Sequence, residues 1–303
     1  MASLLLAALS ASGHTPGETA DSVWSFEPSV VLPLLLMMTT YGAGIRHLQQ
    51  QGIRRRVVSW GRCAAFALGI LALIAALMSP LDLLAEALFS AHMAQHLMLM
   101  LVAPPLLILG RMDIVLLWTF PMPARRLIGQ GWRKATWLRS AFDLLSRPVT
   151  VWLLASSVMW FWHISGPYAW AFYNLDIHIL EHLSFFLTSL AFWTLVLRPF
   201  SREKSGHGAA LVLLATFAME SALLGALLAF AGHPLYAAHA AQVSRHLPHC
   251  LPDLSPLQDQ QLAGLIMWVP ASLVQLVALG AIFADWLSIS PGGRRRTGHL
   301  NAD

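Results

Sequence analysis

Charged residues are scarce in this sequence. Only 11% of its 303 residues are Asp, Glu, Lys or Arg, and 57% are hydrophobic, whereas about a quarter of the residues of a soluble globular protein are charged. This composition excludes an ordinary soluble domain. The apolar runs are continuous and about 20 residues long, as a membrane-spanning helix requires, and lack the short alternating segments of a membrane β-barrel.

Several functional signatures are also lacking. The sequence has no glycine-rich phosphate loop, no nucleophilic triad, no zinc-protease motif and no basic stripe interleaved with aromatic residues. We therefore expect neither an enzyme nor a nucleic-acid partner. Cysteine is limited to Cys63 and Cys250, which the topology below places at opposite ends of the membrane, too far apart for a disulfide.

Hydropathy divides the chain into three parts. Residues 1–27 form an outer N-terminal tail or the remnant of a signal peptide, residues 28–286 a domain of seven transmembrane helices, and residues 287–303 a cytoplasmic basic tail. The apolar segments are approximately 28–46, 57–78, 84–110, 148–165, 174–197, 209–231 and 262–286. Residues 111–147, with Trp132 and Trp137 among basic side chains, are expected to include an interfacial amphipathic helix.

The distribution of basic residues predicts the orientation. With the N-terminus outside and the C-terminus in the cytoplasm, every Lys and Arg except Arg245 falls on the inner side, as the positive-inside rule requires. If one helix were missing, the Lys and Arg residues would be divided between the two sides of the membrane. We therefore predict an all-α polytopic bundle of seven helices in contact with membrane lipid.

Histidine shows the opposite asymmetry, because most histidines fall in the outer half or in outer loops. His92 and His96 are four residues apart on the third helix, and His178 and His182 are four apart on the fifth, so each pair shares one helix face. Imidazole is the commonest protein metal ligand. The predicted metal ligands are His92, His96, His163, His178, His182 and His233.

Methionines accompany the histidines and affect the choice of metal. Met93, Met98 and Met100 lie near the first pair and Met267 on the seventh helix. Thioether and imidazole together favour Cu(I), although methionine is also ordinary packing in an apolar helix. Histidines His239, His246 and His249 with Cys250 form either a second metal-capture patch or, as we expect, a solvated loop.

Acidic residues and prolines add further expectations. Glu181 either orients the imidazole of His182 or is a solvated interfacial carboxylate, and Glu220, near the middle of the sixth helix, is a functional candidate because of its depth. Asp259, with Gln260 and Gln261, is expected to cap the seventh helix. Pro104 and Pro105 should kink the third helix.

Several of these motifs resemble the CtaG family of cytochrome c oxidase assembly factors. The matching runs are His92-Met-Ala-Gln-His96, Ala103-Pro-Pro-Leu-Leu-Ile-Leu-Gly110, Trp162-His163, His178-x-x-x-His182 and Asp259-Gln-Gln-Leu-Ala-Gly-Leu-Ile-Met-Trp268. The resemblance covers roughly residues 24–286. The stretch from His239 to Pro252 departs from it, being longer and richer in histidine, and either captures copper from a periplasmic donor or is lineage-specific.

The resemblance implies a multi-pass protein of the bacterial inner membrane that helps to assemble a haem-copper oxidase. Its expected partners are cytochrome c oxidase subunits, its expected cargo is Cu(I), and the ligand role passes to His92, His96, His163, His178 and His182, with His233 less certain. The alternative is a membrane b-type cytochrome whose paired histidines ligate haem b. A third possibility is a structural subunit whose histidines form only hydrogen bonds.

Overall fold

A computed structural model describes residues 24–198, 204–237, 239–240 and 254–288. The predicted tails 1–27 and 287–303 lie almost entirely outside this part of the chain. Within it all regular secondary structure is helical. The elements are α2 (Pro28–Gln50), α3 (Arg54–Val57), α4 (Trp60–Leu77), α5 (Pro80–Ala87), α6 (Phe89–Leu97), the π-helix η1 (Met98–Val102), α7 (Ala103–Leu109), α8 (Met112–Trp118), α9 (Met122–Lys134), α10 (Thr136–Leu145), α11 (Pro148–Trp162), α12 (Ser165–Tyr173), α13 (Leu175–Leu197), α14 (Lys204–Ala229) and α16 (Pro256–Ser288).

The predicted transmembrane helices are present. Over the described residues, six spans are long and apolar enough to cross a membrane unaided: α2, α4, the run from α6 to α7, α13, α14 and α16. The fourth predicted span is different, because α11 alone has 15 residues and passes the same test only together with α10, from which it is bent by 68°. With that bent pair counted as one broken span, the described residues hold up to seven spans, the number predicted, and the chain is a multi-pass membrane protein.

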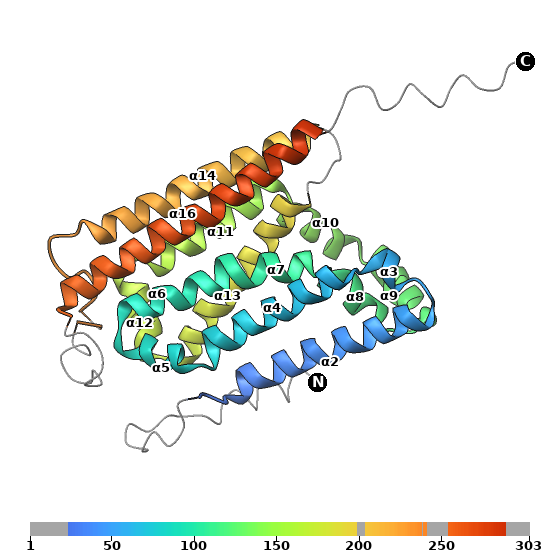
Figure 1. The fold of residues 1–303 in the computed structure, drawn as a ribbon, viewed down its shortest axis with the longest axis horizontal. Helices are drawn as coiled ribbons and strands as arrows, with labels where there is room; N and C mark the ends of the chain where they lie inside the picture. Colours follow the sequence, from blue (N-terminus) through green and yellow to red (C-terminus); the bar gives the residue numbers. More distant parts are fainter. Residues whose placement is uncertain (1–23, 199–203, 238, 241–253, 289–303) are drawn as a thin grey trace, which may run out of the picture.

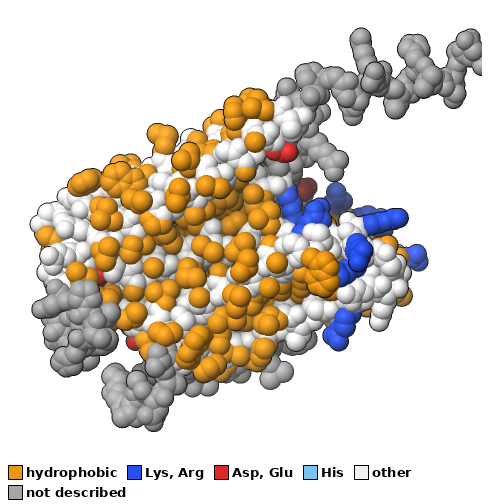
Figure 2. Space-filling view, viewed as in Figure 1, with side chains coloured by type: hydrophobic (Ala, Val, Ile, Leu, Met, Phe, Trp, Pro, Cys, Tyr) orange, Lys and Arg blue, Asp and Glu red, His pale blue; other side chains and the backbone are white. Residues whose placement is uncertain are grey.

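The long helices run side by side with short helices at both ends (Figure 1). One end carries α5, α12 and the start of α16, and the other carries α3, α8 and α9. Lys and Arg side chains gather at the end with α3, α8 and α9, whereas apolar side chains cover the flank (Figure 2). The positive-inside rule predicts that the basic end faces the cytoplasm, and the side of the membrane stays a prediction.

The connection between the third and fourth spans lies on the surface, as the amphipathic pattern predicts. Neither α9 nor α10 has a buried residue. On α9 the exposed Leu127, Ile128 and Trp132 accompany four basic residues. Such a helix buries its apolar side chains at the lipid interface and keeps its charges in water.

The run from α6 to α7 is the centre of the bundle. In its most apolar stretch of 18 residues, 61% of the residues are buried inside the protein, a larger share than in any other candidate span. One face packs in a core with α11, α13, α14 and α16, and the other in a core with α2 and α4. Polar side chains on α6 therefore face protein and not lipid.

The third span is irregular close to its two prolines. The irregularity is η1, which directly precedes α7 with its prolines in the first turn. Pro104 has no N–H to donate to the carbonyl of Met100 four residues earlier. Trp193 of α13 supplies the missing donor, with its indole Nε1 2.9 Å from the Met100 oxygen. A π-helix next to the histidine-bearing turn is typical of functional sites.

Candidate metal centre

The first turn of α6 is held by a carboxylate from the far end of the sequence. Leu88 precedes the helix, and its apolar side chain cannot accept a hydrogen bond to cap it. Asp259 of α16 instead accepts hydrogen bonds from the backbone N–H groups of Phe89 at 2.7 Å and Ser90 at 3.1 Å. A negative charge at a helix N-terminus is favourable, and Asp259 is only 1% exposed. This contact fixes the direction in which α6 presents His92 and His96.

Asp259 lies in the first turn of its own helix, as expected, but it does not cap that helix. The seventh helix begins at Pro256, six residues earlier than the apolar pattern indicates. Its cap is Ser255, whose hydroxyl accepts from the backbone of Gln258 at 3.3 Å while the Gln258 side chain accepts from the Ser255 N–H at 2.9 Å. This reciprocal pair is a capping box and leaves Asp259 available for α6.

The two glutamines after Asp259 bind the connection that follows α14. Gln260 accepts from the backbone N–H of Leu235 at 2.6 Å, and Gln261 donates to the carbonyl of Ala231 at 3.3 Å. The polar start of α16 therefore joins two other elements around the histidine-rich end.

Removing the charge of Asp259 tests this role. We expect Asp259→Asn to lower the free energy of unfolding by about 1–3 kcal/mol, because a buried carboxylate that accepts backbone hydrogen bonds loses one acceptor oxygen. Thermal unfolding of the detergent-purified protein measures the effect. Gln258→Ala, which alters only the exposed cap of α16, is the control, and equal stability of the two variants would contradict the assigned role.

Four of the six predicted ligands meet between α6 and α13. Ring centroids are 4.2 Å apart within each i,i+4 pair. Across the helices His92 lies 5.6 Å from His178, and His96 lies 5.2 Å from His182. The Nε2 atoms of His178 and His182 are 3.0 Å apart. Two nitrogen ligands of one tetrahedral metal ion lie about 3.3 Å apart, because each metal–nitrogen bond is about 2.0–2.1 Å long. The two nitrogens are therefore close to the separation expected of two ligands of one metal ion.

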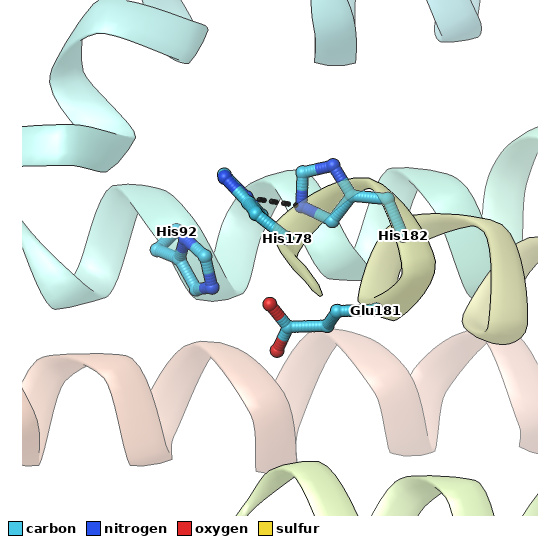
Figure 3. A group of neighbouring side chains, drawn as sticks. All are labelled: His92, His178, Glu181 and His182. Carbon is cyan, nitrogen blue, oxygen red and sulfur yellow. Dashed lines mark hydrogen bonds between the residues drawn. The ribbon is translucent and has the colours of Figure 1, made fainter. Parts of the chain in front are cut away.

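Glu181 points into the same space as the imidazoles (Figure 3). One ligand atom from each of His92, His178, Glu181 and His182 lies within 4.8 Å of the others, and Glu181 Oε1 is 3.9 Å from His96 Nε2. Glu181 is 1% exposed, so the interpretation of it as a solvated carboxylate is wrong. The sequence alone predicted at most an indirect role for Glu181, because its proximity to His92 depends on how α6 and α13 pack together.

His163 and His233 lie outside this group. His163, at the end of α11, donates through Nδ1 to the Met159 carbonyl at 2.7 Å, which leaves its Nε2 unprotonated. Phe185 packs against both His163 and His96, with ring centroids 6.2 Å from His163 and 4.7 Å from His96. His233 is exposed, and the structure does not bring it to the other histidines.

His239 joins the group, although the sequence favoured a solvated loop for it. It is 2% exposed, and its ring lies 5.8 Å from that of His92. Of its expected loop companions, His246, His249 and Cys250 lie outside the described residues. The solvated-loop interpretation is therefore wrong for His239, and no local pattern in the sequence distinguishes it from the loop histidines.

Both ring nitrogens of His239 have partners. Nε2 lies 3.0 Å from the carbonyl oxygen of Ala85, which can only accept, so Nε2 carries the proton. Nδ1 therefore accepts from the hydroxyl of Tyr168. Burial lowers the pKa of His239, with the Ala85 carbonyl and Asp259 opposing the shift in part, and burial raises the pKa of Tyr168 well above its usual value. A neutral imidazole and a protonated phenol fit this arrangement.

Several buried polar atoms at this centre have no hydrogen-bond partner within the described part of the chain. They are His92 Nε2, His96 Nδ1 and Nε2, and Glu181 Oε1. Unsatisfied buried polar atoms are costly and rare, and a metal ion would satisfy several at once. The donor set of neutral imidazoles and one carboxylate thus fits a metal ion. The methionines Met93, Met100 and Met267 are instead part of the hydrophobic core.

Comparison with known proteins identifies the family. Residues 39–288 match the family described as cytochrome c oxidase caa3 assembly factor (Caa3_CtaG). The chain belongs to this family. The match includes every histidine of the centre, and it confirms the resemblance inferred from the sequence motifs.

The curated relatives that match this chain have low sequence identity to it. The chain is 26% identical over 277 residues to the uncharacterized protein Mb0105 of Mycobacterium bovis, covering 88% of the chain and 39% of the relative. It is 25% identical over 279 residues to the uncharacterized protein ML1998 of Mycobacterium leprae, covering 88% and 40%. The chain thus spans about two fifths of the length of these relatives. No solved structure matches it.

Proposed function

We propose that this protein holds Cu(I) as cargo between α6 and α13 and passes it to a subunit of the cytochrome c oxidase that it helps to assemble. His92, His96, His178, His182 and Glu181 would hold the ion. The observation that carries the proposal is the gathering of His92, His178, Glu181 and His182 ligand atoms within 4.8 Å of one another, with His92 and Glu181 buried and the other two partly buried. No catalysed reaction is part of the role, and the protein acts in the bacterial inner membrane.

The net charge of the ligand set supports a monovalent ion. Imidazole binds metals in its neutral form, so Glu181 supplies the only negative charge among these ligands. With Cu(I) the site is electrically neutral, whereas a divalent ion would leave one uncompensated positive charge inside the bundle. A buried unpaired charge is costly. Imidazole also suits copper by ligand type.

Haem binding receives no support from the geometry. A haem ligated by one histidine from each helix needs space as wide as the porphyrin between the two imidazoles. Here the rings of the two helices lie 5.2–6.0 Å apart. Phe185 and Tyr168 pack against them, with centroids 4.7 Å from His96 and 5.6 Å from His92.

Copper content of the purified full-length protein tests the proposal. After loading with Cu(I) under reducing conditions and desalting, the wild type should retain about one copper per chain and remain colourless, because three or four donors suffice for Cu(I). A His92→Ala/His182→Ala variant should retain less than about a tenth of that amount. Mutating a residue that only orients a metal ligand typically lowers metal affinity about 10–100-fold, and this variant loses one ligand from each helix.

His47→Ala is the control for this experiment, because His47 lies in the last turn of α2, packs against Trp118 of α8 and does not belong to the ligand group. It should retain copper like the wild type. Equal retention by the wild type and the double variant, or no retention by the wild type, would overturn the proposal. A Soret band of equal stoichiometry in the purified protein would replace it with haem binding.

A further inference from the structure

A small depression opens at the histidine-rich end of the bundle. It lies between the connection after α14 and the first turns of α6 and α16, and its rim includes the exposed Pro234. Tyr236, His239, Asp259 and Gln260 line it. Gln260 is 2% exposed and its Nε2 has no hydrogen-bond partner within the described residues. Phe89, Pro234, Ala240 and Pro256 complete the lining, and its imidazole and carboxylate groups are of the kinds that bind metal cations.

His239 belongs both to this depression and to the metal centre. It lines the depression, and its ring lies 5.8 Å from that of His92. His92 Nε2 is buried and unpartnered within the described part of the chain. A single imidazole thus lines a surface opening and lies next to His92 of the ligand group.

The nitrogen of His239 that could bind copper is already unprotonated. Nδ1 accepts from the hydroxyl of Tyr168, while Nε2 donates to the Ala85 carbonyl at 3.0 Å. Cu(I) would therefore replace a hydrogen bond and not a proton. Tyr168 also contacts His92, with ring centroids 5.6 Å apart, so its hydroxyl occupies the ligand position next to the buried group.

We propose that His239 is a transient ligand that transfers Cu(I) between the depression and His92. Displacement of the Tyr168 hydroxyl lets Nδ1 of His239 bind Cu(I). A bond from Cu(I) to Nε2 of His92 then forms as the bond to His239 breaks, and the Tyr168 hydroxyl returns to Nδ1. Copper stays Cu(I) throughout, so no electron or proton is exchanged. This inference rests on the proposed function, because it gives the route to the same site.

Kinetics of copper exchange in the full-length protein test the route. Cu(I) is supplied from, and removed by, a coloured Cu(I) chelator such as bicinchoninate, under reducing conditions. For His239→Ala we expect the rate constants of loading and removal both to fall at least tenfold, with the dissociation constant changed less than threefold. A transient ligand alters the barrier in both directions and leaves the end state alone. His233→Ala, an exposed histidine of the same connection, should leave rates and affinity unchanged.

Tyr168→Phe provides a second test that keeps the aromatic packing. Without the hydroxyl, Nδ1 of His239 is free to bind, so loading should be at least threefold faster. Loss of affinity in His239→Ala comparable to that in His92→Ala would make His239 a permanent ligand and overturn the transfer role. Unchanged rates in both His239→Ala and Tyr168→Phe would assign the pair a purely structural role. A wild type that retains no Cu(I) would instead refute the proposed function itself.

Discussion

Glu181→Gln should weaken Cu(I) binding about 100-fold while leaving the fold intact. Glutamine has the same shape as glutamate, so the packing between α6 and α13 is preserved, but the only negative charge among the ligands is lost. Leaving a buried positive charge uncompensated costs about 3 kcal/mol or more, which corresponds to about two orders of magnitude in the dissociation constant. Competition for Cu(I) with a chelator of known affinity measures the change.

Glu220→Gln is the matched control for this prediction. Glu220 is a second carboxylate within the spanning part of the bundle, on α14, and it is partly buried. It does not belong to the group formed by His92, His178, Glu181 and His182. Its replacement should leave Cu(I) affinity unchanged. Equal affinities for the two variants and the wild type would show that charge compensation by Glu181 does not contribute to binding.

The spans could be predicted from the sequence because hydropathy reports directly on contact with lipid. Errors arise where a helix continues into polar residues. The seventh span was predicted at 262–286 but runs Pro256–Ser288, since Asp259 and Gln260 are buried by contacts within the protein. Pro256, at the first position of the helix, was the available signal. The third span was predicted to begin at 84, although α5 ends at Ala87 and α6 begins at Phe89.

The site could be predicted only in part. Spacing of four residues places two imidazoles on one face of each helix, and the structure brings His92, His96, His178 and His182 together. The contributions of Glu181 and His239 depend on which helices are neighbours. The bond from Asp259 to the first turn of α6 joins residues 170 positions apart, and no periodicity within one helix reports such a pairing.

The contact that brings α14 and α16 together should be a sensitive point of the fold. A Cβ atom on Gly264 would lie 2.4 Å from the backbone nitrogen of Ala229 and 2.6 Å from the carbonyl oxygen of Gly225. Both are backbone atoms, so no side chain can rotate to make room. Small residues allow membrane helices to approach closely, and here they hold the polar start of α16 beside the connection that carries His239.

Gly264→Leu should therefore destabilise the protein. Overpacking costs about 1–3 kcal/mol or more, and a cost at the upper end lowers the unfolding temperature by about 5 °C for a chain of this size. Gly280→Leu is the control in the same helix, because nothing lies within 4 Å of a Cβ there. Thermal unfolding in detergent compares the two. Equal stability would mean that α14 and α16 are not in backbone contact at Gly264, and the placement of Asp259 and His239 beside α6 would lose its support.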